Sequence, residues 1–581
     1  MAPTATHGHE PLTRRQILVI LAGLMSGMFL AALDQTIVAT AIRTIADDLQ
    51  GLDQQAWATT AYLITSTIVT PLYGKLSDIY GRKRFYIAAI VIFIVGSLLC
   101  SLSVSMTQLA LARAVQGMGA GGLMSLALAI IGDIVAPRER AKYQGYFLAV
   151  FGTSSVLGPV IGGFFAGQES LLGVAGWRWV FLVNVPVGIL ALVLVTRTLQ
   201  LVHHRLEHRI DWWGAATLAL GLVPLLLVAE QGREWGWTST PALACYAVGG
   251  VSLVAFVAIE RAMGQEALLP ISLFRIRTVG VASAASVTIG MAMFGGLACL
   301  PLYLQIVKGS TPTQAGLQML PLTLGIMTAS IVSGQIISRT GRYRIFPVVG
   351  SFLLAGALFA FHYVHADTPL WQSMTIMVFF GLGLGSNFQP LTLAVQNAVP
   401  ARSIGVATAS AAFTRQIGGT IGTAVFLSVL FSTVPDKIAA AFERAAPSPQ
   451  FQQALADPDN AAFAQQLQQA QDSGGAVDGS GVLDDSSFLI ELDPRLAQPF
   501  LEGFADAMDV VFLVAAIVMV VGCAIIVFLP DLELRRSSAY SERAAEVAAE
   551  IAGKEPPSGT SESESSKPER TNPTDGDHPA A

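Results

Sequence analysis

The chain has 581 residues, of which 53% are hydrophobic and only 13% are Asp, Glu, Lys or Arg. An ordinary soluble domain carries about twice that charged fraction, and so few charges could not cover this much apolar surface in water. The composition and the net charge of −6 therefore argue against a soluble enzyme and against a nucleic-acid-binding protein.

Apolar stretches of about 20 residues follow one another along the chain, each long enough to cross a membrane as a helix. The runs are continuous rather than alternating, which favours helices over a β-barrel. We therefore expect an all-α polytopic membrane protein with fourteen transmembrane helices. The expected spans are residues 17–40, 57–75, 85–104, 108–131, 145–166, 179–196, 212–230, 241–260, 278–304, 315–337, 345–364, 370–397, 404–432 and 507–529.

The distribution of Lys and Arg between the connecting segments predicts the orientation. With the N-terminus inside the cell, the inner segments carry 25 of the 34 basic residues and the outer segments carry seven. This bias follows the positive-inside rule. We expect a multi-pass protein of the plasma or inner membrane with both termini in the cytoplasm.

One segment occurs twice. Gly74 to Arg84 recurs as Gly334 to Arg344 with Gly, Gly, Arg and Arg at the same spacing, each time at the inner end of an outside-to-inside helix. Two parallel, pseudo-symmetric halves explain this repeat, with six helices each and two inserted helices between them.

These features divide the chain into six expected parts. They are a cytoplasmic tail (1–16), an N-terminal half (17–196), two inserted helices with flanking loops (197–277), a C-terminal half (278–434 and 506–529), a long extracytoplasmic loop with short helices near 450–471 (435–505), and a disordered cytoplasmic tail (530–581).

The first copy of the repeat has the features of a gating loop. Gly74 allows close helix approach, Asp78 can face the positive end of a neighbouring helix, and Gly81 turns the chain. Arg82 can pair with acids or lipid phosphates, and Asp133 either joins this cluster or is a solvated loop charge. The alternative interpretation is a basic loop with turn glycines.

Two ionisable residues inside the spans are the main candidates for function, because such residues are costly in a membrane. Asp34 lies about 9 Å from the outer end of its helix and Arg113 about 7.5 Å from the outer end of another, so the two can meet at one depth. A carboxylate can carry protons when burial and a nearby arginine oppose each other in setting its pKa. We expect Asp34 to carry the proton and Arg113 to tune the pKa of Asp34. The alternative is that the pair only fastens two helices together.

Other polar residues in the spans are candidates for a substrate cavity. Gln116, Asn184, Asn387 and Gln389 could face such a cavity or pack between helices. Arg415 lies near the middle of its span and is either a substrate contact or a partner for helix carbonyls. No other buried carboxylate is expected in a span, which favours exchange of one proton.

Cysteines and nucleotide motifs indicate neither a metal site nor a cofactor. Cys100, Cys245, Cys299 and Cys523 lie far apart in apolar runs, and we interpret them as packing residues. The chain has no Gly-x-x-x-x-Gly-Lys-Ser/Thr phosphate loop. A proton gradient is therefore the expected source of energy.

Several motifs together resemble the major facilitator superfamily. Residues 74–84 resemble its loop signature, residues 109–122 its fourth-helix pattern, and residues 158–163 the motif associated with antiporters. Residues 33–38 and 177–186 are similar to the fourteen-helix drug:proton antiporter family. One departure stands out, because Ser338 occupies the place in the second loop that Asp78 has in the first. This puts an equivalent charged latch in the C-terminal half in doubt.

The antiporter motif consists of Gly158, Pro159, Gly162 and Gly163. Proline frees a helix hydrogen bond and should kink this span. We expect the kink to shape the outer gate and to limit proton leak.

The resemblance implies a secondary active transporter, not an enzyme. It would export amphipathic, apolar or cationic small molecules, such as drugs, in exchange for protons by alternating access. Export of a lipid or another endogenous metabolite is the alternative, with an accessory lipoprotein or acceptor at the outer loop. A membrane-embedded enzyme or sensor is a distant alternative, because no span carries a nucleophile with a histidine or a metal cluster.

Overall fold

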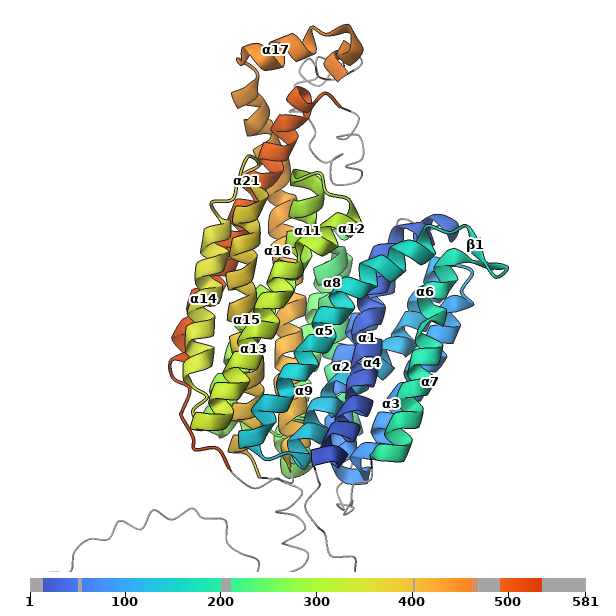
Figure 1. Cartoon of the computed structure of the whole chain (residues 1–581), viewed down its shortest axis with the longest axis vertical. Coiled ribbons are helices and arrows are strands. Elements are labelled where there is room, and N and C mark those ends of the chain that lie inside the picture. The colour runs from blue at the N-terminus through green and yellow to red at the C-terminus, as the bar shows by residue number, and fades with distance from the viewer. Residues whose placement is uncertain are drawn as a thin grey trace, which may run out of the picture.

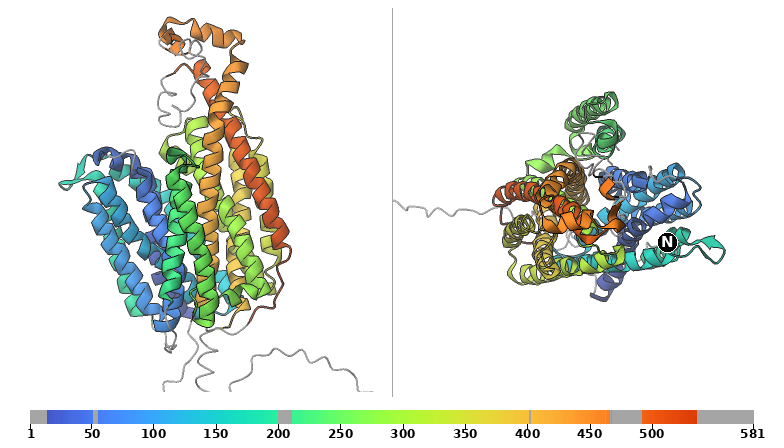
Figure 2. Two further views of the ribbon diagram at one scale, coloured as in Figure 1. Left: turned by 180° about the vertical axis from the view of Figure 1, so that it is seen from behind. Right: turned by 90° about the horizontal axis from the view of Figure 1, so that it is seen from above.

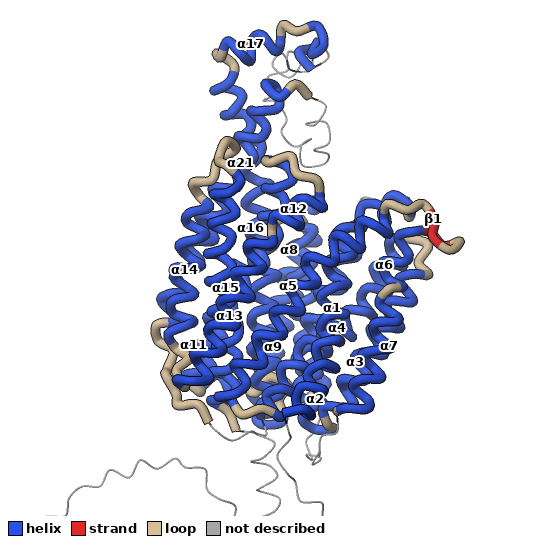
Figure 3. The backbone as a smooth tube through the Cα atoms, in the orientation of Figure 1, coloured by secondary structure: helices blue, strands red, loops and turns tan. Residues whose placement is uncertain are grey.

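A computed structural model describes residues 14–50, 55–199, 211–400, 403–461, 463–465, 467 and 492–535. Within these ranges the chain forms fourteen helices of fifteen residues or more, and most of them run side by side (Figures 1 and 3). Ten helices are long and apolar enough to cross a membrane. The expected all-α polytopic class is confirmed, and each expected span coincides with a long helix. Most of the two terminal tails lies outside the described residues.

The N-terminal half consists of the first six long helices and a small hairpin between the last two. The strands β1 (Ser170–Leu171) and β2 (Val174–Ala175) pair antiparallel, which makes them an exception to the all-α expectation. The helices are α1 (Arg14–Asp48), α2 (Gln55–Tyr80), α3 (Arg82–Ser101), α4 (Met106–Ile134), α5 (Pro137–Ala166), the short α6 (Trp179–Leu182) and α7 (Asn184–Thr198).

The inserted helices α8 (Trp212–Trp235) and α9 (Thr240–Met263) lie side by side at the periphery, as the view from above shows (Figure 2). Leu222 of α8 and Phe256 of α9 belong to one apolar cluster with Ile64 of α2 and Phe413 of the C-terminal half. The pair therefore packs against both halves of the molecule.

The C-terminal half follows a short helix, α10 (Ile271–Arg275), and repeats the arrangement of the first half. Its elements are α11 (Arg277–Leu302), which continues as a π-helix to Val307, α12 (Pro312–Gln318), α13 (Leu320–Thr340), α14 (Ile345–Phe361), α15 (Leu370–Ala398), α16 (Ile404–Ala445) and α21 (Pro494–Ile526). Gly81 after α2 and Gly341 after α13 both have positive φ angles, 103° and 73°. The repeated segments therefore turn the chain in corresponding places.

We call the end that contains the turns at Gly81, Val135 and Gly341 the base, and the opposite end, which carries α17 (Pro449–Leu455), the crown. The base is the end that the sequence predicts to be cytoplasmic. Toward the crown the N-terminal and C-terminal helices diverge (Figures 1 and 2).

The expected outer loop at 435–505 is helical at both ends. Helix α16 has 42 residues, about 63 Å at 1.5 Å per residue, whereas the hydrocarbon core is about 30 Å thick. Beyond the predicted span, Ile438 of α16 packs closely against Gly503 of α21, and the rings of Phe442 and Phe500 lie 4.8 Å apart. The expected loop segment therefore begins and ends as helix, because these apolar faces pair with each other and prolong both helices as a helical hairpin.

Glycines on α4 set how closely the N-terminal helices pack. A Cβ atom on Gly119 would lie 2.6 Å from the backbone nitrogen of Phe93 and 2.7 Å from the carbonyl oxygen of Ala89. A Cβ on Gly117 would likewise meet the carbonyl oxygen of Tyr62 in α2. The glycine run in this helix is therefore a packing surface for α2 and α3.

Gly119→Ala should destabilise the protein, because the added methyl group overlaps backbone atoms of α3 that cannot move independently. Overpacking of this kind costs about 1 to 3 kcal/mol, and thermal unfolding in detergent should show a lowered Tm. Gly356→Ala is the matched control, because no atom lies within 4 Å of its Cβ position. Equal Tm values for the two variants would contradict the assignment of α4 as the close-packed helix.

Candidate functional site

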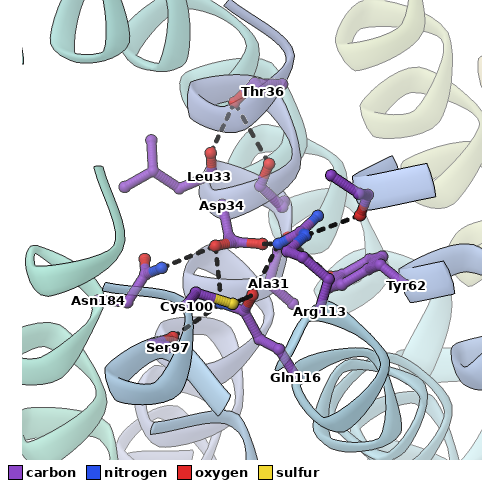
Figure 4. Close-up of polar contacts among 12 residues, drawn as sticks. Ala31, Leu33, Asp34, Thr36, Tyr62, Ser97, Cys100, Arg113, Gln116 and Asn184 are labelled. Atoms are coloured by element: carbon purple, nitrogen blue, oxygen red, sulfur yellow. Dashed lines mark hydrogen bonds and ion pairs between the residues drawn. The ribbon is translucent and has the colours of Figure 1, made fainter. Parts of the chain in front are cut away.

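Asp34 of α1 and Arg113 of α4 form a buried ion pair in the N-terminal half (Figure 4). Arg113 Nη1 lies 2.5 Å from Asp34 Oδ2, and the two side chains are 1% and 0% exposed. The depth of each residue in its helix predicted this meeting, and the structure confirms it.

The second carboxylate oxygen of Asp34 accepts two more hydrogen bonds. Gln116 Nε2 donates to Asp34 Oδ1 over 2.8 Å, and Asn184 Nδ2 donates to the same oxygen over 2.7 Å. Helices α1, α4 and α7 therefore meet at one carboxylate. Gln116 and Asn184 are fully buried, so these two candidate cavity residues serve as partners of Asp34 in this structure.

Arg113 is also held on several sides. Its Nη1 donates to Gln116 Oε1 over 2.7 Å and its Nε donates to the carbonyl oxygen of Ala58 over 3.1 Å. Its guanidinium carbon lies 4.2 Å from the centroid of the Tyr62 ring. Desolvated charges are tolerated only when paired and hydrogen-bonded, and this network meets that requirement. Protonation of Asp34 would remove the charge that balances Arg113.

A second charged cluster lies at the base and joins the two halves. Asp78 and Arg82 form an ion pair, and Arg82 Nε lies 2.9 Å from Asp133 Oδ2. Asp78 Oδ2 accepts a hydrogen bond of 3.0 Å from the backbone nitrogen of Val406, in the first turn of α16. The carboxylate thus meets the positive end of a helix of the other half, as predicted. Asp133 belongs to the cluster rather than to solvent.

Glycines bring the backbones of this cluster together. A Cβ on Gly74 would meet Ala409 of α16, and a Cβ on Gly405 would meet both the Arg82 guanidinium and the Asp78 carboxylate. The predicted role of Gly74 in close helix approach is confirmed. Gly405, which sequence reasoning missed, is required for the same contact.

The C-terminal half uses a different latch at the base. Ser338 Oγ donates to the carbonyl oxygen of Gln335, within its own helix, over 2.8 Å. Instead, Arg140 of α5 donates to Gln396 Oε1 of α15 over 2.5 Å, and Gln396 Nε2 donates to the carbonyl oxygen of Leu128 over 3.1 Å. An arginine of α5 and an amide of α15 therefore join the halves at the base. Arg140 could not be singled out by sequence, since Arg138 and Lys142 lie beside it.

The antiporter motif packs α5 against α1 next to the buried ion pair. A Cβ on Gly158 would meet Thr36, two residues from Asp34, and a Cβ on Gly162 would lie 2.8 Å from the carbonyl oxygen of Ile37. Pro159 faces α12 instead of α1, since its Cγ is 3.1 Å from the place where a Cβ atom on Gly316 of α12 would lie. Gly163 lies one residue further along the same helix and is partly buried.

The remaining candidate cavity residues lie in the C-terminal half. Asn387 is buried and accepts a hydrogen bond of 3.0 Å from Ser351 Oγ of α14, so it packs two helices together. Gln389 is also buried. Arg415 lies with its guanidinium carbon 3.8 Å from the centroid of the Phe388 ring.

Two further buried carboxylates lie in the expected spans and correct the expectation that Asp34 stands alone there. Asp509, in the middle of α21, is 8% exposed, and Glu260, near the base end of α9, is 1% exposed. Glu260 Oε2 accepts a hydrogen bond of 3.0 Å from the backbone nitrogen of Leu269. Both residues lie near the ends of the expected spans 507–529 and 241–260, where the hydropathy pattern does not separate a buried acid from a solvated one.

One group within the described ranges has metal-ligand spacing, with His365, Asp506 and Asp509 offering atoms within 4.8 Å of one another. Asp506 already pairs with Arg444 over 2.6 Å, and the His365 side chain is 57% exposed. We assign no metal to this group.

Comparison with known proteins identifies the family. The model of the Major Facilitator Superfamily matches residues 24–423. The chain belongs to the major facilitator superfamily. Its members are transporters, and the protein is accordingly a membrane transporter rather than an enzyme.

Relatives of this transporter include proteins named for multidrug transport and for tetracycline resistance. The chain is 36% identical over 414 residues to the multidrug transporter protein MdtP of Bacillus subtilis, covering 71% of this chain and 75% of MdtP. It is 40% identical over 343 residues to the tetracycline resistance determinant of Streptomyces rimosus, covering 58% of this chain and 95% of that protein. An uncharacterized MFS-type transporter of Mycobacterium tuberculosis is 34% identical, covering 92% of this chain and 72% of that protein.

Solved structures support the same fold. The proton:xylose symporter XylE matches this transporter with a TM-score of 0.53 and 14% identity, over 90% of this chain and 97% of XylE. This likeness shows the major facilitator fold.

Gly405→Ala should open the base of the transporter, because the added methyl group would displace Arg82 and Asp78. A penalty of about 1 to 3 kcal/mol raises the open population roughly 5- to 150-fold. The measurement is maleimide labelling of Ala409→Cys, which is buried against Gly74, in purified protein whose four native cysteines are replaced by alanine. The rate should rise in Gly405→Ala and stay unchanged in Gly250→Ala, whose Cβ position is open. Equal rates would show that Gly405 does not hold the latch.

Proposed function

We propose that this transporter exports drug-like small molecules in exchange for protons, with Asp34 as the proton carrier. The observation that carries the proposal is the buried Asp34 and Arg113 pair, completed by Gln116 and Asn184. The names of MdtP and of the tetracycline resistance determinant support drugs as the substrate class. The positive-inside distribution supports a plasma or inner membrane location with cytoplasmic termini.

Proton binding at Asp34 would change the forces between helices. Ionised Asp34 holds Arg113 and two amides, and so fastens α1 to α4 and α7. Neutral Asp34 leaves the Arg113 charge unbalanced in a low-dielectric site, which is costly. A shift of α1 relative to α4 would relieve that cost. Thr36, two residues away, donates to the carbonyl oxygen of Ser154 over 3.0 Å and would pass such a shift to α5.

Alternating access requires two states of the base, and the described contacts define one of them. The hydrogen bonds between Asp78 and Val406 and between Arg140 and Gln396 hold the halves together at that end. The helices of the two halves diverge toward the crown (Figure 1). With the base in the cytoplasm, this state would face outward. Coupling then consists of Asp34 protonation releasing the base and substrate binding restoring it.

The proton gradient is sufficient for useful export. One proton moving inward through 100 mV releases about 2.3 kcal/mol, and one pH unit adds about 1.4 kcal/mol. For a neutral substrate exchanged one for one, the sum supports a gradient of several hundredfold. For a monovalent cation the charges cancel and only about tenfold per pH unit remains.

The helical hairpin at the crown is where the predicted acceptor or accessory lipoprotein would dock. Arg444 of α16 and Asp506 of α21 pair across it over 2.6 Å, and its phenylalanines pack inside. A rigid projection of this kind supports the idea of a docking partner. Export of a lipid to such a partner stays a prediction.

Asp34→Asn should abolish substrate efflux driven by a pH gradient and leave the fold intact, because asparagine keeps the shape but cannot carry a proton. Dye efflux from inverted vesicles with an imposed gradient is the measurement. Asp48→Asn is the matched control, since it makes the same change on the same helix, at a residue that accepts a 2.6 Å bond from Trp177 Nε1 at the crown.

Normal gradient-driven efflux in Asp34→Asn would rule out Asp34 as the carrier. Loss of efflux in both variants would indicate damage to α1 instead. Substrate-free thermal unfolding of each purified variant separates these cases.

Pro159→Ala should raise the leak of protons without substrate, because a straightened α5 would lose its fit against Gly316 in α12. A pH-sensitive dye inside proteoliposomes measures the leak. Pro224→Ala removes a proline from the middle of α8, in the inserted pair, and serves as the control. An unchanged leak in Pro159→Ala would argue against a gating role for the kink.

A further inference from the structure

Arg415 is a charge deep in the helical body that neither the proposed coupling site nor the latches use. It lies eleven residues after the start of α16, about 16 Å along the helix. Its side chain is partly buried and stacks on the ring of Phe388, 3.8 Å from the centroid. In the described part of the chain its guanidinium forms no hydrogen bond and no ion pair.

Contacts of its neighbours place Arg415 at the boundary between the two halves. Gln416, the next residue, donates to Ser66 Oγ of α2 over 2.9 Å. Thr408, two helical turns toward the base on the same face, accepts a 2.9 Å bond from Gln396 Nε2 of the base latch. A molecule bound between the halves on the crown side of these contacts would therefore lie within reach of Arg415.

The described carboxylates near this boundary do not balance the positive charge of Arg415. Arg113 is paired with Asp34, and the Asp34 carboxylate is fully occupied by three donors. A cationic substrate would therefore have to displace Arg113 to reach Asp34. Arg415, by contrast, carries five N–H donors on a guanidinium that stays charged, and no described carboxylate balances it.

Such a residue in a membrane needs a partner, since an unpaired buried charge is costly. The planar guanidinium fork matches a carboxylate or a similar delocalised anion through two parallel hydrogen bonds. Stacking on Phe388 leaves the edge of the guanidinium for these bonds. The missing partner is then supplied from outside the chain.

We propose that Arg415 binds an acidic group of the exported molecule, so that the transporter prefers amphipathic substrates with a carboxylate or enolate over their neutral or purely cationic analogues. Phe388 offers an aromatic surface to the apolar part of the same molecule. This inference rests on the proposed export function and narrows the sequence expectation, which included cations. The membrane potential favours it, because an anion leaving the cell and a proton entering both move in the electrically downhill direction.

Rhodamine 110 and rhodamine 123 make a matched pair of probes, because the first has a free carboxylate and the second is its methyl ester. Fluorescence anisotropy titrations with purified wild-type protein should give at least about tenfold tighter binding of the acid, the worth of one charge-assisted interaction. Arg415→Gln should remove that preference by weakening the acid at least tenfold while changing the ester less than twofold. Arg415→Lys should restore part of it, since lysine keeps the charge and loses the fork.

Arg339→Gln, at an exposed arginine of α13, is the control and should leave both affinities unchanged. The proposal is overturned if the wild type binds the ester as tightly as the acid, if it binds neither dye, or if Arg415→Gln weakens both dyes equally. Flux of either dye in proteoliposomes under a pH gradient tests the export function separately, so preferential acid binding without any flux would refute the proposed function and retain the role of Arg415.

Discussion

The buried ion pair between Asp34 and Arg113 is the constraint on which the N-terminal half depends. Two charges can stay in an environment of low dielectric only if they are paired with each other and hydrogen-bonded. Four helices meet that demand, because α1 supplies Asp34, α4 supplies Arg113 and Gln116, α7 supplies Asn184, and α2 supplies the Tyr62 ring and the Ala58 carbonyl. Any change in the charge of Asp34 consequently alters a set of contacts to which all four helices contribute.

Close backbone approach makes this arrangement possible. Glycines of α4 admit α2 and α3, and glycines of α5 admit α1 beside Thr36. The same device recurs at the base, where Gly405 leaves room for Arg82 and Asp78 to reach the first turn of α16. Close helix packing thus builds both the proposed coupling site and the contacts at the base.

The two halves share a fold and differ in chemistry at equivalent places. The N-terminal half closes the base with carboxylates and an arginine, whereas the C-terminal half contributes Gln396 and receives Arg140 from α5. Deeper in the body, the N-terminal half holds a neutral ion pair, while Arg415 of the C-terminal half has only an aromatic ring as a described side-chain partner. In the functions proposed above, proton exchange therefore belongs to one half and substrate recognition to the other.

Hydropathy, which is a local property, was enough to predict the fourteen helices, because the bilayer imposes length and composition on each span separately. The recurrence of residues 74–84 at 334–344 predicted the parallel repeat, and the resemblance of several motifs implied the major facilitator fold. Depth along the helix was enough to predict that Asp34 and Arg113 meet. The partners of a polar side chain depend instead on which helix faces lie together, which one sequence does not specify. Only the tertiary structure therefore showed that Gln116 and Asn184 bind Asp34, that Arg140 and Gln396 join the halves at the base, and that α16 and α21 continue as a paired hairpin at the crown.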